Sequence, residues 1–419
     1  RTTNPILKIT DSTVTQSGTT NLIQIDSGVT GTLEGQFAVF TDATITAGEK
    51  FLLLDGAVTS KGVDPFIEIS SSTVNVDYDF IEIASAGTLN LSGSLLKAGS
   101  TLTIAKDTAR FGDLLDIHSG GQLVMNSSDP VVEFAGGTHT IGTSGASVDS
   151  PNRLARLSGV NIDSVTGLGT DRPIKGNGTN PAAFSGATNP IGTFLKATDD
   201  ATLTVHLSTG DSDGGNALGL DKALLEASAP IVHLIGKSTQ TELSTGEDAL
   251  AIKQSKVVAL GPIVSLDKGL ITVNKGALLT LTDGSKMTVT GDLLKLVNGS
   301  KITVVDGPLI RVSGVAPSGS SPSVSTLDVS GALVNFGGTG GNKIFVTNNI
   351  VPDNLLVSGI PVSTVIGGGG SVSIGPNPIK NANLGTIFVN TIEEVGVDVN
   401  FTGSLIETIS SGTVTITAP

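Results

Sequence analysis

The chain has 419 residues, no cysteine, no tryptophan and a formal net charge of −14 at pH 7. Without cysteine it forms no disulfides and offers no thiolate metal ligands. A long polyanion is repelled by nucleic acid and by anionic lipid headgroups, so we expect neither as a partner. No apolar stretch approaches about 18 residues, so no membrane-spanning helix is predicted.

The residue types favour strands over helices throughout the chain. Hydrophobic residues make up 38% of the sequence, mostly Val, Ile, Leu and Ala; aromatic residues make up only 3%, and there are 54 glycines. β-Branched side chains fit a pleated, half-buried surface, whereas glycine at this frequency would interrupt helices repeatedly. The composition therefore predicts an all-β protein.

Residues 1–142 carry a repeated apolar box, which consists of two apolar residues, one variable residue and one further apolar residue. A turn and a second short strand follow each box, and pairs such as Asp55-Gly56 mark the turns. We interpret this region as regular N-terminal coils of a solenoid, because each unit can bury its apolar side only against its neighbours. The boxes recur at a nearly constant interval and begin at Ile6, Leu22, Phe37, Phe51, Phe66, Phe80, Leu95, Leu114 and Val131.

Residues 143–248 keep the pattern less strictly. Stretches rich in Gly, Asn and Pro, such as residues 167–192, predict lateral loops that leave the rod between coils. The segment from Asp211 to Gly214 is similar to the start of a calcium loop, but it lacks a third oxygen ligand at the right spacing and the later bidentate glutamate. Calcium at Asp211 and Asp213 is left as a hypothesis, and no cofactor is predicted.

Residues 249–312 are the most regular part, and residues 313–419 contain looser coils of the same kind. An antiparallel sandwich would have no reason to keep equivalent strands at one fixed interval. The fixed spacing therefore favours a parallel β-solenoid that forms one continuous rod. The regular boxes follow one another at almost equal steps and begin at Ile263, Leu278, Leu293 and Leu309.

The length of the rod depends on how many boxes form one coil. About 20 short repeats at roughly 4.8 Å per rung would give a rod of about 95 Å if each box were one coil. Two boxes per coil would halve that length, and the spacing alone does not decide between the two arrangements.

Residues that carry catalytic chemistry are few and scattered along the sequence. A carbohydrate-active β-helix needs carboxylates clustered in one groove, and we predict no catalytic residue, no metal ligand and no enzyme activity. The acids Glu82, Asp116 and Glu133 are interpreted as outward-facing strand residues, and the pairs Asp199-Asp200 and Glu393-Glu394 as solvated turns. The four histidines are dispersed, at His118, His139, His206 and His233, and the strand-like surroundings of His139 and His206 predict packed or solvated side chains there.

The boxes from Phe51 to Ile141 and from Ile263 to Val312 resemble those of bacterial secreted β-solenoids. Autotransporter passenger domains and filamentous-haemagglutinin-type adhesins are the families that this repeat style resembles. The resemblance implies an extracellular or cell-surface protein with a structural or adhesive role. It implies no functional residue. The first residue, Arg1 rather than Met, suggests a removed leader.

The two ends of the repeat pattern suggest a function. Neither end carries a capping helix or a charged segment, and an uncapped solenoid exposes unpaired backbone and an apolar cross-section. We therefore predict a structural subunit of an extracellular homopolymeric filament, in which copies stack end to end. The residues expected at the subunit joint are Ile6, Leu7, Ile9, Val14, Leu405, Ile406, Val414 and Ile416.

The main alternative is a monomeric rod-like surface adhesin. In that case the loops within residues 142–192 or 313–378 would bind a surface or a glycan. A trimeric fibre of the phage type and a carbohydrate-active β-helix are further alternatives.

Overall fold

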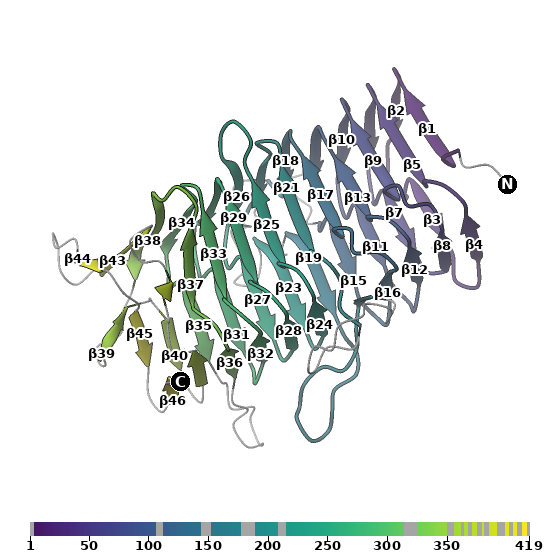
Figure 1. Cartoon of the computed structure of the whole chain (residues 1–419). Coiled ribbons are helices and arrows are strands. Elements are labelled where there is room, and N and C mark those ends of the chain that lie inside the picture. Colours follow the sequence, from purple (N-terminus) through teal and green to yellow (C-terminus); the bar gives the residue numbers. More distant parts are fainter. Residues whose placement is uncertain are drawn as a thin grey trace.

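The computed structural model describes residues 4–105, 112–143, 152–176, 189–207, 215–313 and 325–349, and beyond them the backbone of strands β39 to β46. Every regular element in this part of the chain is a β-strand. The strands stack into an elongated rod with the N-terminal coil at one end (Figure 1). The predicted all-β parallel solenoid is confirmed.

Each coil contains four strands and therefore two apolar boxes. The first strand, Leu7–Thr10, pairs with the strand one coil further on, so that Leu7 lies opposite Ala38. In the same sheet, Ala38 pairs with Ile67, and Ile67 pairs with Leu96, and the two sequence intervals are equally long. Each interval contains one further box, which belongs to another sheet. Because one sheet contains 11 strands, the rod is about 50 Å long at roughly 4.8 Å per coil. The arrangement with two boxes per coil, and the shorter rod, is the one observed.

Two sheets are formed by the first box strand of each coil and by the strand after it. Sheet A contains β1 (Leu7–Thr10), β5 (Ala38–Thr41), β9 (Ile67–Ser70), β13 (Leu96–Ala98), β17 (Val132–Ala135), β21 (Leu195–Thr198), β25 (Val232–Ile235), β29 (Val264–Asp267), β33 (Leu294–Val297), β37 (Val334–Gly337) and β42 (Ile379–Lys380). Sheet B contains β2 (Thr13–Gln16), β6 (Thr44–Ala47), β10 (Thr73–Val76), β14 (Thr101–Ile104), β18 (Thr138–Ile141), β22 (Thr202–Val205), β26 (Thr241–Thr245), β30 (Gly269–Val273), β34 (Lys301–Asp306), β38 (Asn342–Asn349), β43 (Gly385–Thr391) and β44 (Val399–Phe401).

The second box of each coil forms sheet C, and the strand after it forms a fourth face that is divided into sheets D1 and D2. Sheet C contains β3 (Ile23–Ile25), β7 (Leu52–Leu54), β11 (Ile81–Ile83), β15 (Leu115–Ile117), β19 (Arg153–Ser158), β23 (Asn216–Asp221), β27 (Leu250–Lys253), β31 (Leu279–Thr282), β35 (Ile310–Ser313), β40 (Thr364–Gly367), β45 (Leu405–Thr408) and β39 (Leu356–Pro361). Sheet D1 contains β4 (Thr30–Leu33), β8 (Ala57–Ser60), β12 (Thr88–Leu91), β16 (Gln122–Met125) and β20 (Ile174–Gly176). Sheet D2 contains β24 (Leu224–Ala227), β28 (Lys256–Ala259), β32 (Lys286–Val289), β36 (Thr326–Val329), β41 (Ser371–Ile374) and β46 (Thr413–Ile416).

The strand pairs are parallel, with two exceptions near the C-terminal end. There β39 runs antiparallel to β45, and β44 runs antiparallel to β43. The parallel pairing along the rest of the rod excludes the antiparallel sandwich. It also places equivalent residues of successive coils directly on one another, so each side chain between the two end coils has a column neighbour on either side.

The box pattern follows from which positions face the interior. In the box at Phe66, the first residue lies just before the strand, and Phe66, Ile67 and Ile69 are each at most 1% exposed. The variable residue, Glu68, faces outward. Stacking then places residues of the same type on one another: the rings of Phe37 and Phe66 lie 4.8 Å apart and nearly parallel. Such columns form one continuous apolar core along the described rod.

Buried serines stabilise the coil corners. Ser285, between sheets C and D2, is fully buried. Its hydroxyl lies 3.2 Å from the Ser255 backbone nitrogen, whose N–H it accepts, and it can donate to the Thr282 carbonyl oxygen at 2.6 Å. The preceding corner residue, Asp283, has φ 55°, which turns the chain from one face to the next. The hydroxyl therefore satisfies a backbone donor that water cannot reach.

We expect Ser285→Ala to lower the free energy of unfolding by about 1–3 kcal/mol, because the buried Ser255 N–H loses its acceptor. Urea unfolding monitored by circular dichroism measures this loss. Ser330→Ala is the matched control, since the Ser330 hydroxyl accepts the Gly291 N–H at an exposed position, where water can replace it. Equal losses in the two variants would contradict this role of the corner serines.

Candidate functional site

The N-terminal residues predicted at the subunit joint lie on the first coil, which has no coil on its outer side within the described structure. Ile6 is 64% exposed, although Phe37, the residue next to it in the same column, is only 5% exposed. Leu7, Ile9 and Val14 pack against the core but are only partly buried. Their neighbours in the second coil are fully buried, namely Ala38, Phe40 and Ile45.

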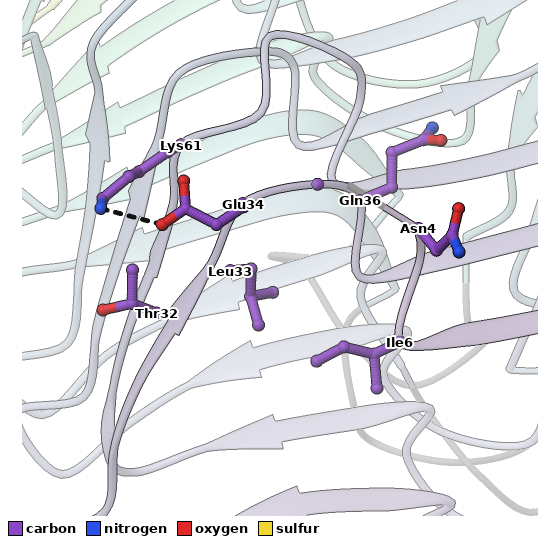
Figure 2. Close-up of a pocket in the computed structure, with 8 residues that line it drawn as sticks. Asn4, Ile6, Thr32, Leu33, Glu34, Gln36 and Lys61 are labelled. Atoms are coloured by element: carbon purple, nitrogen blue, oxygen red, sulfur yellow. Dashed lines mark hydrogen bonds and ion pairs between the residues drawn. The ribbon is translucent and has the colours of Figure 1, made fainter. Parts of the chain in front are cut away.

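A pocket of about 400 Å³ lies beside Ile6 at this end of the rod (Figure 2). Ile6 and Leu33 provide its apolar lining, and an ion pair between Lys61 and Glu34, 3.1 Å long, lies at its edge. The full lining consists of Asn4, Ile6, Thr32, Leu33, Glu34, Gly35, Gln36 and Lys61.

The C-terminal residues predicted at the joint lie at the opposite end of the rod (Figure 1). Leu405 and Ile406 are on β45, and Val414 and Ile416 are on β46. The side chains of these strands lie outside the described residues. The backbone shows that β45 has β39 antiparallel on its outer side, whereas β46 is the last strand of sheet D2.

Among the remaining residues considered from the sequence, Asp200 is on an exposed turn. Its carboxylate accepts the backbone N–H groups of residues 237–239. His139 is packed in the core, with 2% of its surface exposed. Asp211, Asp213 and the Glu393-Glu394 pair lie outside the described residues.

The structure also brings together an acidic cluster that the sequence interpretation missed. On the outer face of sheet C, Glu82 of β11 lies in register with Asp116 of β15, and Asp116 lies in register with Arg156 of β19. These two acids are expected to face outward, and the structure adds that they are nearly covered: Glu82 is 8% exposed and Asp116 5%. They do point away from the core, but the residues around them cover them.

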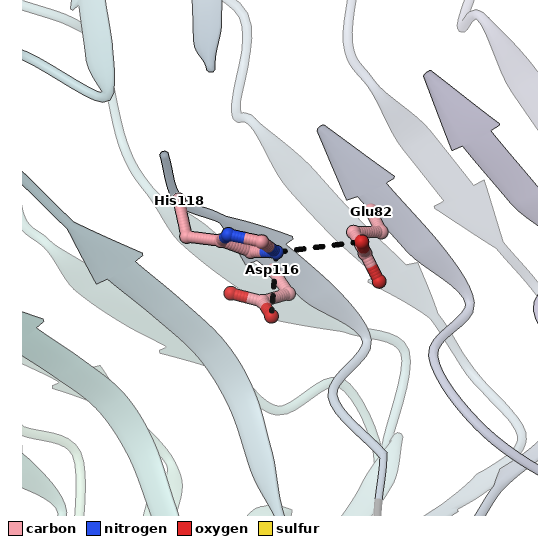
Figure 3. A group of neighbouring side chains, drawn as sticks. All are labelled: Glu82, Asp116 and His118. Carbon is pink, nitrogen blue, oxygen red and sulfur yellow. Dashed lines mark hydrogen bonds and ion pairs between the residues drawn. The ribbon is translucent and has the colours of Figure 1, made fainter. Parts of the chain in front are cut away.

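His118 lies between the two carboxylates (Figure 3). Its Nε2 is 3.3 Å from Oε1 of Glu82 and 3.7 Å from Oδ2 of Asp116. Its Nδ1 lies 2.8 Å from the hydroxyl of Ser119. On the far side of Glu82, the Lys50 ammonium pairs with Oε2.

Two further carboxyl groups lie beside this cluster, just before the same two strands. Oδ1 of Asp79 accepts the Asp113 backbone N–H at 2.8 Å, and Oδ1 of Asp113 accepts the Arg153 backbone N–H at 2.7 Å. Asp79 is 7% exposed and Asp113 4%. The four acids therefore form a compact, mostly buried block.

Burial and hydrogen bonding decide which of these carboxyl groups are protonated and which are ionised. Burial raises the pKa of Asp79 to about 8 and raises the pKa of Asp113 well above its usual range. Burial acts in the same direction on Glu82, but hydrogen bonds from His118 and Lys50 outweigh it and lower the pKa of Glu82 to about 2. The hydrogen bond to Glu82 raises the pKa of His118. At neutral pH, Glu82 is thus a carboxylate, and Asp79 is largely neutral.

A comparison with protein families, with curated proteins and with solved structures returned no match for this chain. In the described part of the chain, no helical segment has the length and apolar character needed to cross a membrane.

Proposed function

We propose that this protein is a structural subunit of an extracellular homopolymeric filament, in which copies of the chain stack end to end. The observation that carries the proposal is the incomplete burial of the first coil. Ile6 is 64% exposed, in the same column in which Phe37 and Phe66 are 5% and 1% exposed. A further coil on the outer side of β1 would bury Ile6 as Phe66 buries Phe37.

A second copy of the chain is the occupant that best fits this surface. The outer edges of β1 to β4 present backbone donors and acceptors on four faces at once, and another coil of the same cross-section offers partners for all four. The half-buried Leu7 and Ile9 would continue their columns across the joint. Such a head-to-tail contact does not close on itself, so it extends into a filament.

An extracellular, non-enzymatic role is part of the same proposal. Charged residues make up only 15% of the chain, and cysteine is absent. The repeat style resembles autotransporter passenger domains and filamentous-haemagglutinin-type adhesins, in which solenoids serve as surface structures. In the acidic cluster, less than a tenth of Glu82 and of Asp116 is exposed, which leaves little carboxylate surface for a polysaccharide chain to contact.

Negative-stain electron microscopy over a range of concentrations tests the filament. We expect uniform fibres for the wild-type chain and short rods for Ile6→Lys, because an ammonium group would be buried without a partner in the joint. Val63→Lys is the matched control. Val63 is also an exposed apolar residue, 76% accessible, but it lies on the side of the rod in the second coil, and this variant should still form fibres.

Two outcomes would contradict the filament proposal. Single rods at every concentration would indicate that the joint does not form. Discrete dimers would indicate that two first coils pair around a two-fold axis, which closes the contact instead of extending it.

One observation, an exposed apolar lateral loop, favours the alternative function as a monomeric adhesin. Between residues 159 and 171, Val160, Ile162 and Val165 are 59%, 42% and 91% exposed. The loop is held in place, because the Asp171 carboxylate accepts the Val160 N–H at 2.6 Å. If the chain is a monomeric adhesin, Val165→Lys should weaken its attachment to a target surface, and Ile6→Lys should not.

A further inference from the structure

We propose that Glu82, Asp116 and His118 bind one divalent first-row transition-metal ion of the zinc class on the outer face of sheet C. Each residue offers one ligand atom, and these atoms all lie within 4.8 Å of one another. Figure 3 shows the three side chains converging from two neighbouring strands and the turn that follows the second. The proposal is independent of the filament.

The distances fit such an ion. Zinc binds carboxylate oxygen and imidazole nitrogen at about 2.0–2.2 Å in a tetrahedron, which places two ligand atoms about 3.3–3.6 Å apart. Nε2 of His118 is 3.3 Å from Oε1 of Glu82 and 3.7 Å from Oδ2 of Asp116. An ion can therefore enter between these atoms if the carboxylate oxygens of Glu82 and Asp116, which lie within 4.8 Å of each other, move toward it.

An unsatisfied oxygen of Asp116 is the second, independent observation. Only 5% of this residue is exposed, and its Oδ1 is buried without a hydrogen-bond partner. A buried carboxylate oxygen without a partner is costly, and each such case in a folded protein needs an explanation. The oxygen of Asp116 nearest His118 is Oδ2, so an ion held by both oxygens of this carboxylate would also satisfy Oδ1.

Neighbouring groups orient the ligands as they do in metal sites. The Ser119 hydroxyl, 2.8 Å from Nδ1 of His118, fixes the imidazole ring so that Nε2 points at the two carboxylates. Lys50 pairs with Oε2 of Glu82, which leaves Oε1 directed toward His118. Hydrogen bonds of this kind set the ring orientation and tautomer of ligating histidines.

The donor set selects the type of metal. Two carboxylates and a neutral imidazole match the charge of a divalent ion, and two cations lie just outside these ligands: the Lys50 ammonium on Glu82 and the Arg156 guanidinium, 3.6 Å from Oδ2 of Asp116. The imidazole favours zinc, cobalt, nickel or copper over calcium and magnesium, which prefer oxygen ligands alone. Three protein ligands leave one position of a tetrahedron open for water.

Isothermal titration of the full-length, tag-free chain with ZnCl₂ tests the site after EDTA treatment and dialysis. We expect saturable binding of about one ion per chain. His118→Ala and Glu82→Gln should each weaken it at least about tenfold, since even the partners of metal ligands are worth 10–100-fold in affinity. His233→Ala is the control, because His233 is a half-buried histidine on the outer face of sheet A.

Cobalt provides a readout that a purely structural role would not change. CoCl₂ should give the visible absorption of a four- or five-coordinate ion in the wild-type chain, and His118→Ala should lose it. Circular dichroism of each variant checks that it is folded. The absence of saturable zinc binding by the folded wild-type chain would overturn the proposal. An equal loss in His233→Ala would also overturn it, because it would indicate adventitious binding to surface histidines.

Discussion

Leu279→Asp is expected to produce the largest loss of stability among the substitutions considered. Leu279 lies on β31 and is fully buried in an apolar column, between Leu250 of the preceding coil and Ile310 of the next. A carboxylate at this position has no cation and no water to contact. The substitution both removes the packing of a leucine and buries an unpaired charge, and we expect it to cost about 4 kcal/mol or more.

Thermal and urea unfolding of the variant measure this loss, and Thr288→Asp is the control. Thr288 lies on β32, in the same coil, but its side chain is exposed, so aspartate there should change the stability by less than about 0.5 kcal/mol. Because each coil contacts only its neighbours, the damage should spread outward from this coil and broaden the transition. An unchanged midpoint for Leu279→Asp would show that the inward register of sheet C is wrong.

The repeat pattern predicts the fold because each box states directly which residues face inward. In the box at Leu278, residues Leu278, Leu279 and Leu281 are fully buried, as the pattern predicts. The number of boxes per coil could not be predicted, because the boxes of sheets A and C follow the same rule. Only the strand pairing distinguishes them: Leu279 lies opposite Leu250 and not opposite Val264, which belongs to the other sheet.

The acidic cluster could not be predicted for two physical reasons. The first is that coil length varies: the step from Ile81 to its partner Leu115 is longer than the step from Leu52 to its partner Ile81. A constant repeat would therefore not have placed Glu82 beside Asp116. The second is coverage, because strand alternation tells which side chains point outward but not whether other residues cover them.

His139 is a residue whose burial the local sequence does not determine but the stacking of the coils does. The sequence Thr138-His139-Thr140 is compatible with either a packed or a solvated ring. In the structure His139 lies in register between Leu102 and Leu203. Its ring is 4.2 Å from that of Phe134, and its Nε2 donates to the Gly136 carbonyl oxygen at 2.8 Å. The column therefore contains one titratable group among aliphatic residues.

This group is expected to make the rod less stable in acid. Burial lowers the pKa of His139 from 6.5 to about 4, and its Nδ1 has no hydrogen-bond partner. Below pH 6.5 the unfolded chain takes up a proton at this residue, whereas the folded chain does so only near pH 4. The unfolded state therefore gains relative stability as the pH falls through this window. The loss for the folded state reaches about 3 kcal/mol once the pH is below both values.

His139→Leu should remove this acid-dependent loss of stability and place an aliphatic side chain in the column, like those of its neighbours. At pH 7.5 the variant and the wild-type chain should have similar urea midpoints, because both side chains are neutral there. At pH 4.5 the variant should be the more stable by about 2–3 kcal/mol. Other acids titrate in both proteins, so their effects cancel in this difference. His233→Leu, on the outer face of sheet A, should leave most of the acid sensitivity in place. A difference between His139→Leu and wild type that stays constant from pH 7.5 to 4.5 would show that the His139 ring is accessible to protons in the folded rod.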